Sequence, residues 1–451
     1  MNVMPFVHEG LGNSSYLVEL AGREALLVDP DRSAERYTRA AEDRGLRIVA
    51  VLETHLHADF VSGAREIAGA MKKAELCLPE GAEARFAHRP LAAGQILMLG
   101  GVQIEVLPSP GHTPEHLSYA LRPPGEPPLL FSGGSLIVGG AARTDLLGDH
   151  LTEELTRLQF QTLHRSFTSL PDATLLYPTH GAGSFCSVGG SGARTSTLGT
   201  ERAANPLLAM DDPEAFVAWF TTTFPAAPDY FYRLRAVNQA GPRLRSEVPA
   251  PRRLDAEAFD RLRAEALVVD VRPTAEYARE HIHGALSNPF RSAYAIWLGW
   301  LVASETQLLF VLGDTPLQRV VDESLLVGHE RLVGWLEGGM DAWRESGRPP
   351  ARSGLIDAPH ARRALSDGAV AVDVREPDEF AAGHIEGALH LPLGSLTRRL
   401  DEAPRDRPLV VYCGHGERAA SAVSLLEARG FESLLNLDGG FAAWRAERRS
   451  A

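Results

Sequence analysis

The chain has 451 residues, a length that favours about three domains and excludes a single small binding module. With 44% hydrophobic and 23% charged residues it has an ordinary globular composition, and no run approaches the ~20 apolar residues that a membrane span needs. The formal net charge of −13 and the lack of a strong basic run argue against a nucleic-acid partner.

The N-terminal segment has no basic region followed by an apolar stretch, so we expect no secretory signal and a cytoplasmic protein. Three cysteines, Cys77, Cys186 and Cys413, are too few for a disulfide scaffold. We therefore interpret each of them as a reduced thiol.

Residues 1–245 alternate short apolar runs with Gly/Pro turns, and helical patterns lie between them. The apolar runs are 15–20, 24–30, 48–54, 96–109, 117–121 and 175–180. This mixture predicts a first domain of α/β or α+β class with two packed sheets flanked by helices.

Histidines follow several of these predicted strands. His55, His57 and Asp59 come directly after the run 48–54, and their alternate spacing in an extended segment would let them converge on one point. His112 and His180 follow two later strands, so the four histidines could form one polar cluster that holds zinc, iron or copper. The alternative is a set of hydrogen-bonded structural histidines.

The segments THLHADF (54–60), PSPGHTPEH (108–116), FSGGSL (131–136), ARTDL (142–146) and YPTHGAGSFC (177–186) resemble the metallo-β-lactamase fold family. Within that family they look like the persulfide dioxygenase branch. The resemblance implies a four-layer αββα sandwich and a mononuclear Fe(II) held by His55, by His112 and by an Asp in the segment FSGGSL. Around this site we expect further residues that support the metal ligands or bind substrate: His57, Asp59, Arg143, Asp145, His180 and Cys186.

Gly134 stands where the family's third ligand, an aspartate, is expected, and the register of Arg143 and Asp145 excludes a simple shift of alignment. Glycine has no donor atom, so metal affinity should fall unless water, a thiolate, an anion, Asp59 or Asp145 fills the place. Phe60 stands where relatives with two metals have a histidine, which makes a dinuclear zinc hydrolase less favoured. Zinc remains the alternative metal.

The C-terminal part contains an internal repeat. Residues 268–285 and 371–388 share ten of eighteen aligned positions, and the similarity resumes at 336–343 and 437–444. Short apolar runs followed by helical stretches predict two small α/β domains, 254–348 and 355–451, next to Pro/Arg-rich linkers at 241–253 and 346–354.

Cys413 follows a strand-like run and precedes a helical stretch, with glycines at 414 and 416 that permit a tight loop. Inward-pointing N–H groups of such a loop and the helix N-terminus favour a thiolate. Together with the motifs DVR, GHIEGA and LDGGFAAW, this loop resembles the rhodanese (sulfurtransferase) family. The resemblance implies that Cys413 carries a persulfide in a cradle formed by Gly414, His415, Gly416, Glu417 and Arg418.

The first repeat has no such nucleophile, because the 26-residue spacing that joins Cys413 to Gly439 leads from Gly338 back to Leu312. We interpret it as a pseudo-rhodanese domain that serves as a spacer or docking surface, with a thiol-carrier site as the alternative. Cys186 could carry a persulfide near the histidines or simply pack in the core, where we also place Cys77.

The order of the three domains resembles persulfide dioxygenase–sulfurtransferase fusions that act in sulfide and persulfide oxidation. The resemblance implies a low-molecular-weight thiol persulfide (of glutathione, coenzyme A or a similar thiol) as substrate, with sulfite or thiosulfate as the sulfur partner. The alternatives are a sulfurtransferase whose first domain has lost its oxygenase activity and, less favoured, a zinc-dependent hydrolase. The sequence leaves open whether the chain forms a homo-oligomer.

Overall fold

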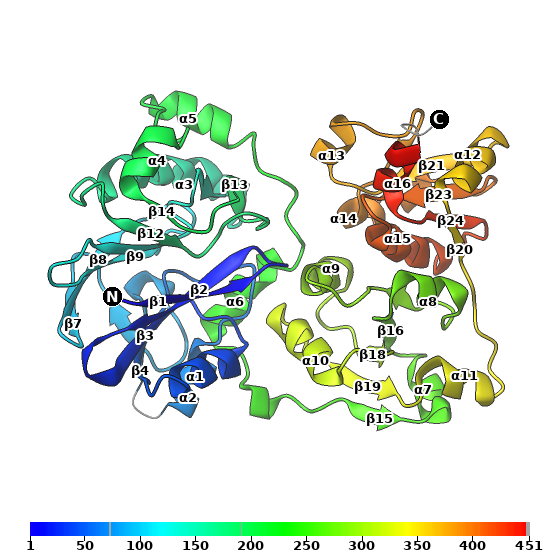
Figure 1. Cartoon of the computed structure of the whole chain (residues 1–451), viewed down its shortest axis with the longest axis horizontal. Helices are drawn as coiled ribbons and strands as arrows, with labels where there is room; N and C mark the ends of the chain where they lie inside the picture. The colour runs from blue at the N-terminus through cyan, green and yellow to red at the C-terminus, as the bar shows by residue number, and fades with distance from the viewer. Residues whose placement is uncertain (72–73, 191, 448–451) are drawn as a thin grey trace. The chain divides into compact units, whose positions relative to one another are not determined.

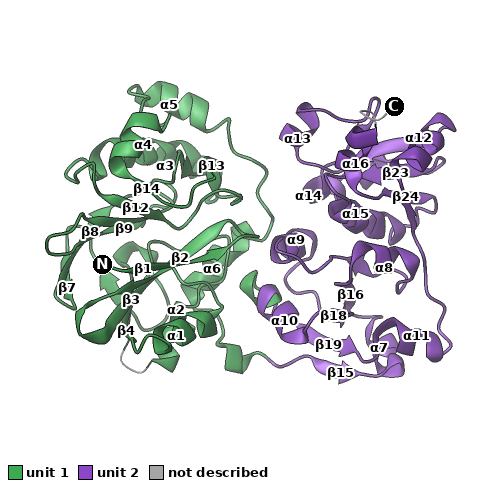
Figure 2. Cartoon of the chain, viewed as in Figure 1, with its two compact units in different colours: residues 1–248, 324–328 green, residues 249–323, 329–451 purple. Residues whose placement is uncertain are grey.

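The structure is a computed structural model that describes residues 1–71, 74–190 and 192–447; the last four residues of the predicted 355–451 domain thus lie outside it. The chain forms two compact units, residues 1–248 with 324–328 and residues 249–323 with 329–451 (Figure 2). Within the described ranges, no helix has the length and apolar character needed to cross a membrane.

Unit 1 contains two six-stranded sheets (Figure 1). The first follows chain order: β1 (Val3–His8), β2 (Asn13–Glu19), β3 (Glu24–Val28), β4 (Arg47–Leu52), β5 (Glu75–Pro79) and β6 (Arg89–Leu91). The second has the order β14 (Ser196–Thr197), β12 (Leu175–Pro178), β10 (Leu129–Gly133), β9 (Leu117–Arg122), β8 (Val102–Pro108) and β7 (Ile96–Leu99). The short strands β11 (Gly140–Ala142) and β13 (Ser187–Gly189) form a separate antiparallel pair.

Alternation along the strands divides the side chains of the first sheet between two cores. Leu26 and Leu52 join the core that fills the space between the two sheets, together with Tyr119 and Phe131 of the second sheet. Leu27 and other odd-numbered neighbours face the opposite way, toward the helices. The second sheet packs helices on its outer face in the same manner. Unit 1 therefore has the predicted αββα layers.

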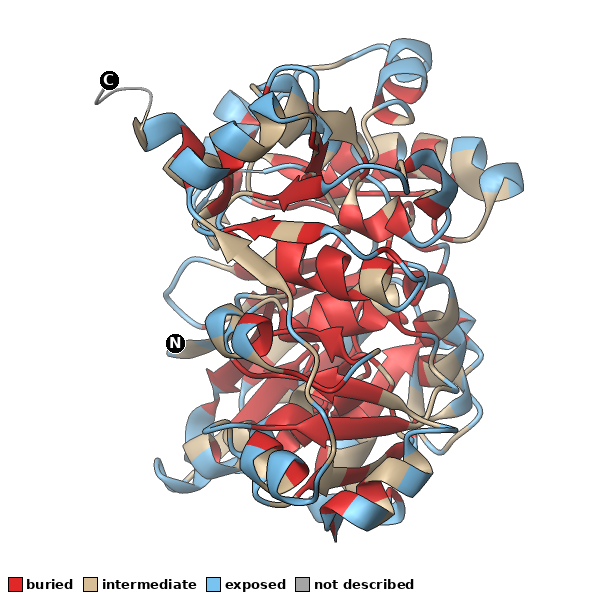
Figure 3. Cartoon of the chain, turned by 90° about the vertical axis from the view of Figure 1, so that its right-hand side faces the viewer, coloured by how far each residue is buried: buried red, intermediate tan, exposed pale blue. Residues whose placement is uncertain are grey.

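The helices of unit 1 cover the outer faces of the sheets or follow them in the chain. They are α1 (Ala34–Glu42), α2 (Ala64–Ala70), α3 (Asp149–Gln161), α4 (Leu198–Ala204), α5 (Pro213–Phe220) and α6 (Phe231–Ala240), with short turns η1 (Ala21–Arg23), η2 (Glu80–Ala82), η3 (Thr162–Ser166) and η4 (Arg245–Glu247). Buried residues concentrate in the strands and on the inner sides of helices, while exposed residues lie on loops and outer helix faces (Figure 3).

Unit 2 contains two five-stranded parallel sheets of the same topology. Their orders are β15 (Arg252–Leu254), β19 (Leu332–Leu336), β18 (Leu308–Val311), β16 (Leu267–Asp270), β17 (Leu286–Ser287) and β20 (Gly354–Ile356), β24 (Leu434–Leu437), β23 (Leu409–Tyr412), β21 (Val370–Asp373), β22 (Leu389–His390). The helices are α7 (Ala256–Leu262), α8 (Thr274–Arg279), α9 (Tyr294–Leu301), α10 (Leu317–Leu326), α11 (Gly339–Glu345) and α12 (Ala358–Ser366), α13 (Pro377–Ala381), α14 (Leu393–Leu396), α15 (Glu417–Glu427), α16 (Gly440–Glu447), with the turn η5 (Leu400–Glu402).

The repeated DVR motif has the same structural role in both sheets. Arg272 binds the buried Asp270 through Nε and Nη2 at 2.9 and 2.6 Å, and Arg375 binds Asp373 at the same two distances. Each guanidinium also donates to a backbone carbonyl eight residues on in the chain, at 2.7 Å. The predicted architecture, two packed sheets flanked by helices followed by two small α/β domains, is confirmed.

The two repeats contact each other within unit 2. The Ser287 N–H donates to Ser424 Oγ at 3.0 Å, and His281 Nε2 lies 3.0 Å from Glu427 Oε2. Trp300 Nε1 donates to the carbonyl of Gly394 at 3.1 Å, where any Cβ would collide with the indole ring. Polar and aromatic contacts thus fix the first repeat against the second.

Candidate functional site

Three loops of unit 1, each following a strand, bring histidines together. His55 follows β4, His112 follows β8 and His180 follows β12, and all three side chains are buried. One ring nitrogen from each lies within 4.8 Å of those of the other two, and His55 Nε2 is 3.3 Å from His180 Nε2. We call these three residues the histidine cluster.

Hydrogen bonds to Nδ1 determine which nitrogen of His55 carries the proton. Thr54 Oγ1 donates to Asp29 Oδ2 at 2.7 Å, so its oxygen is left to accept a bond from His55 Nδ1 at 2.8 Å. With the proton on Nδ1, His55 keeps an unprotonated Nε2 whose lone pair is available on the side of His180.

His112 and His180 have the same arrangement. His112 Nδ1 donates to the carbonyl oxygen of Arg143 at 2.6 Å, and its buried Nε2 has no hydrogen-bond partner among the described residues. His180 Nδ1 lies 3.2 Å from both Asn13 Oδ1 and Asp59 Oδ2. The Nε2 atoms of the cluster are thus left as lone-pair donors, the form in which imidazole binds a metal.

Burial also keeps two of these imidazoles, those of His55 and His112, neutral. It lowers the pKa of His112 to about 3, with the charge of His180 acting in the same direction. The pKa of His55 is likewise held well below its usual value by burial and by the neighbouring histidines. His55 and His112 therefore present neutral nitrogen ligands at physiological pH, the form that binds a divalent metal ion.

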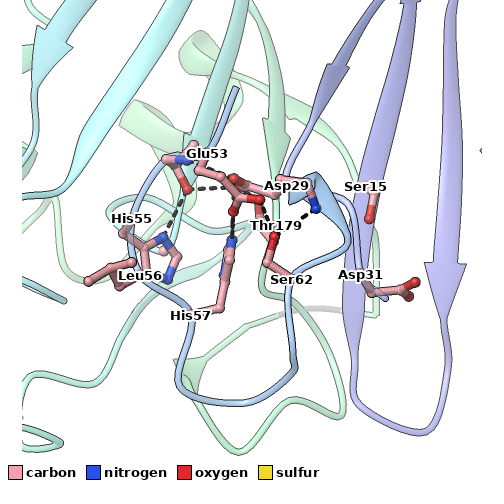
Figure 4. Close-up of polar contacts among 12 residues, drawn as sticks. Ser15, Asp29, Asp31, Glu53, His55, Leu56, His57, Ser62 and Thr179 are labelled. Atoms are coloured by element: carbon pink, nitrogen blue, oxygen red, sulfur yellow. Dashed lines mark hydrogen bonds and ion pairs between the residues drawn. The ribbon is translucent and has the colours of Figure 1, made fainter. Parts of the chain in front are cut away.

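His57 approaches the other two predicted residues in pairs: it offers a ligand atom within 4.8 Å of one of His55, and a ligand atom within 4.8 Å of one of Asp59. His57 also has two carboxylate partners. Its Nε2 lies 2.9 Å from Glu53 Oε2 and 3.3 Å from Asp29 Oδ1 (Figure 4). Burial opposes its charge, but these two carboxylates outweigh it and raise the pKa of His57 to about 10. The ring stacks on Phe60 at 4.3 Å.

Asp59 and Asp145, the two acidic candidates for the missing ligand, differ in their contacts. Asp59 offers a ligand atom within 4.8 Å of His57 and His180, and its Oδ1 is buried without a hydrogen-bond partner among the described residues. Asp59 Oδ2 accepts from Asn13 Nδ2 at 2.7 Å and faces Nδ1, not Nε2, of His180. Both oxygens of Asp145 are bound by Arg143, at 2.6 and 2.7 Å. The suggestion that Asp145 fills the place left by Gly134 is therefore not supported by its contacts.

Gly134 faces the histidine cluster directly. A Cβ at this position would lie 2.7 Å from His112 Cδ2 and 3.0 Å from His180 Cδ2. The imidazoles of His112 and His180 and the side chain of Ala142 occupy the space that a side chain would need. The histidine cluster therefore offers three nitrogen donors, with no carboxylate from position 134.

The cysteines of unit 1 are buried. Cys186 is fully buried, and burial raises the pKa of its thiol well above the usual value. Cys77 packs between the two sheets, and burial raises its pKa to about 12. Both thiols therefore stay protonated at neutral pH.

Cys413 begins the loop between β23 and α15 in the second repeat. Its side chain is buried, and the Gly416 N–H donates to Sγ at 3.1 Å. Gly416 has φ 116° as N-cap of α15, a conformation that favours glycine. The backbone of the predicted cradle thus points a donor at the sulfur, next to the positive end of a helix.

The side chains of the predicted cradle residues differ in their surroundings. Arg418 binds both oxygens of Glu379 at 2.6 and 2.8 Å, His415 is exposed, and Glu417 starts α15. In the first repeat the corresponding position after β18 is Leu312, which is buried and has no nucleophilic atom.

Several functional contacts were missed by the sequence interpretation. Asp29, Asn13 and Glu53 hold the ring nitrogens or loops of the histidines, and Glu379 binds Arg418. The one available signal was an acidic or amide residue at a strand end, which Asp29 and Glu53 share with many structural residues.

Comparison with known proteins assigns both parts of the chain. The metallo-beta-lactamase superfamily matches residues 8–180, and the rhodanese-like domain matches residues 255–346 and 357–447. The thiosulfate sulfurtransferase GlpE of Ectopseudomonas mendocina is 45% identical over 91 residues, which are 20% of this chain and 84% of that protein. The chain belongs to the rhodanese family. It carries a metallo-beta-lactamase domain ahead of two rhodanese-like domains.

Other similarities fall on parts of the chain. A hydroxyacylglutathione hydrolase of Synechococcus sp. is 34% identical over 165 residues, 35% of this chain and 61% of that protein. A crystal structure of a metallo-beta-lactamase from Staphylococcus aureus has a TM-score of 0.65 and 26% identity, and it covers 74% of this rhodanese-family chain and 98% of its own. ETHE1 from Myxococcus xanthus is 25% identical with a TM-score of 0.46, over 53% of this chain and 99% of its own.

Proposed function

We propose that this chain oxidises a low-molecular-weight thiol persulfide in its metallo-beta-lactamase domain and transfers sulfane sulfur through Cys413 in its second rhodanese-like domain. The observation that carries the transfer activity is the N–H of Gly416 on Cys413 Sγ at the start of α15. A thiolate in that position is a stabilised nucleophile.

The transfer step begins with attack of the Cys413 thiolate on the outer sulfur of the donor. The donor's S–S bond breaks, the electron pair leaves with sulfite (from thiosulfate) or with a thiolate (from a thiol persulfide), and Cys413 keeps one sulfur as a persulfide. A second nucleophile then takes this sulfur and restores the thiolate. The backbone N–H of Gly416, which donates to Cys413 Sγ, would stabilise negative charge on the sulfur during this transfer.

For the first domain we propose that His55, His112 and His180 hold a mononuclear Fe(II), with zinc as the alternative. A bound Fe(II) would supply the one-electron chemistry that reaction with O₂ requires. The overall change is balanced as RSSH + O₂ + H₂O → RSH + H₂SO₃. Thr54, Arg143 and Asn13 orient the three rings through Nδ1, and burial excludes water from them.

The proposed partners are a persulfide of glutathione, coenzyme A or a similar thiol, with sulfite or thiosulfate as the small sulfur compound. Sulfite from the first domain is an acceptor for the second: RSSH + SO₃²⁻ → RSH + S₂O₃²⁻. We place this chemistry in the cytoplasm, where thiols such as Cys413 remain reduced.

One observation favours a second candidate. Gly134 removes the carboxylate that the dioxygenase resemblance requires, so a sulfurtransferase whose first domain only binds a persulfide or a partner would have the same cradle around Cys413. Similarity to a hydroxyacylglutathione hydrolase keeps a zinc-dependent hydrolase as a weaker third candidate.

Elemental analysis of anaerobically purified protein, combined with O₂ uptake on addition of glutathione persulfide, separates the three. About one iron per chain with persulfide-dependent O₂ uptake and sulfite release is the expected result. Absence of uptake after reconstitution with Fe(II), with intact sulfur transfer, would establish the transferase without oxygenase. Zinc with thioester hydrolysis would establish the hydrolase.

Variants connect these activities to residues. His55→Ala should lose metal, whereas His150→Ala, at an exposed position on α3 of the same domain, should retain it. Retention of stoichiometric metal and O₂ uptake by His55→Ala would contradict the proposed cluster.

A further inference from the structure

A cavity of about 380 Å³ lies between the two repeats of unit 2, beside the loop that carries Cys413. One wall comes from the first repeat and includes Phe290, Arg291 and Thr315. The other comes from the second repeat and includes His415, Gly416 and Glu417. The inactive repeat therefore forms part of the surface that a substrate of Cys413 would meet.

Arg291 is the cationic side chain of the first-repeat wall. It lies between β17 and α9, is half-buried, and has no side-chain hydrogen bond or ion pair within the described part of the chain. Burial lowers the pKa of Arg291, while Glu417 and Cys413 act in the opposite direction. A guanidinium stays charged under these conditions and presents a planar fork of donors.

The other arginine near the loop is already neutralised. Arg418 forms two hydrogen bonds to the Glu379 carboxylate, so its charge and its fork are satisfied. Ser287 pairs with Asp270 in the first repeat, and His390 pairs with Asp373 at the same place in the second. Arg291 lies four residues after Ser287, so its counterpart is Gly394, four residues after His390. The second repeat therefore lacks an arginine at that position.

Contacts between the repeats fix the place of Arg291. Ser287, four residues earlier, donates its N–H to Ser424 on α15, the helix that follows the Cys413 loop. The Phe290 N–H donates to the carbonyl of Val271 at 2.9 Å, which anchors the residue next to Arg291. The guanidinium is thus carried on backbone that is attached both to its own sheet and to α15.

We propose that Arg291 of the first repeat is a substrate-binding residue of the second: it binds the oxyanion of a sulfur donor or acceptor, sulfite or thiosulfate, beside Cys413. Arg forks can bind two oxygens of such pyramidal or tetrahedral oxyanions. Glu417 and Asp438 on the second-repeat wall carry negative charge, so within this cavity an anion is favoured only at the guanidinium. This inference rests on the proposed sulfur transfer at Cys413.

The test is equilibrium binding of thiosulfate to the full chain carrying Cys413→Ser, which allows binding without turnover. Adding Arg291→Gln should weaken binding about 10- to 100-fold, the value of a charge-assisted hydrogen bond. Arg291→Lys keeps the charge but lacks the planar fork of donors, so its affinity for thiosulfate should lie between those of the Arg291 and Arg291→Gln chains. Arg279→Gln, on the exposed end of α8 beside the cavity at Leu312, should leave binding unchanged.

In chains with intact Cys413, Arg291→Gln should raise the KM for thiosulfate by a similar factor. If Cys413→Ser abolishes transfer but Arg291→Gln leaves thiosulfate binding unchanged, the role of Arg291 is overturned while the proposed sulfur transfer stands. Sulfur transfer that survives Cys413→Ser would instead overturn the proposed function and this inference with it.

Discussion

A buried carboxylate, Asp29, connects the loops that carry two histidines of the cluster. Its oxygens accept from the Thr54 N–H and hydroxyl at 2.7 Å each, and from the Thr179 hydroxyl beside His180. Its backbone has φ 46°, an uncommon conformation for a residue other than glycine. Asp29 therefore acts on the cluster through Thr54: it accepts the hydroxyl proton of Thr54, so the Thr54 oxygen can accept a hydrogen bond from His55 Nδ1.

This arrangement predicts the effect of Thr54→Val. The variant keeps the shape of the side chain but removes the acceptor of the His55 Nδ1 proton, so the ring loses its orientation and its preferred tautomer. We expect metal affinity to fall by about 10- to 100-fold. A dissociation constant for Zn²⁺ by competition with a chelator measures it. Thr54→Ser, which keeps the hydroxyl, is the control, and equal affinities of the two variants would contradict the role of the hydroxyl.

Gly134 permits a second prediction at this scale. Because a Cβ there would lie 2.7 Å from His112 Cδ2, Gly134→Ala and Gly134→Asp should both destabilise the metal-free domain by about 1–3 kcal/mol. The Asp variant alone adds a donor atom, so added Zn²⁺ or Fe(II) should raise its Tm more than that of the Ala variant. Thermal unfolding with and without metal tests this, and equal metal-induced shifts would show that position 134 does not face the bound metal.

Sequence reasoning located the loops of this site better than the contacts within them. His55, His112 and His180 follow apolar runs, and polar residues at strand ends are recognisable from the pattern alone. The contacts of His57 with Glu53 and Asp29 depend on the packing of β3 beside β4. Local spacing carries no information about that pairing.

At the level of elements, α13 begins with a carboxylate in an unfavourable place. Burial raises the pKa of Glu376 to about 7, with Arg418 opposing this and Glu379 and Asp378 adding to it. Its Oε1 is buried without a hydrogen-bond partner among the described residues. An unfolded glutamate has a pKa of about 4.3. As pH rises from about 4.3 to about 7, the unfolded chain ionises more readily than the folded one, so the folded state is destabilised.

Glu376→Gln should therefore stabilise the second rhodanese-like domain at high pH only. Below pH ~4 both states hold the proton and the variant should match the original chain; above pH ~7.5 the full cost applies, and the variant should be more stable by about 1–3 kcal/mol. Denaturant unfolding at several pH values measures this difference. Asp378→Asn, an exposed carboxyl on the same helix, should change stability by only a few tenths of a kcal/mol.

The repeat explains what could be predicted about these elements. Identical spacing placed Leu312 and Cys413 at equivalent strand ends, and the structure has β18 and β23 immediately before them. Arg291 had no such signal, because its relevance comes from the contact of the first repeat with α15 and not from its own repeat. Comparison of the two repeat sequences therefore does not identify a residue of one repeat that contributes to the site of the other.

For the whole molecule, the histidine cluster and Cys413 belong to different compact units. The sequence predicted the order of three domains from the histidine motifs and the repeat, and the family matches confirm a metallo-beta-lactamase domain followed by two rhodanese-like domains. The partition of chemistry between the units stays a prediction.

That prediction can be tested by complementation. Cys413→Ser should abolish sulfur transfer and retain persulfide-dependent O₂ uptake, and His55→Ala should do the reverse, so neither variant alone should convert a persulfide and O₂ efficiently to thiosulfate through the enzyme. Because sulfite is a small diffusible product, an equimolar mixture of the two variants should restore thiosulfate formation, measured by ion chromatography. Mixing either variant with buffer alone corrects for the uncatalysed reaction of sulfite with persulfide. If each single variant lost both activities while remaining folded, the two sites would not be independent, and a mixture without activity would show that the product must pass between sites of one chain.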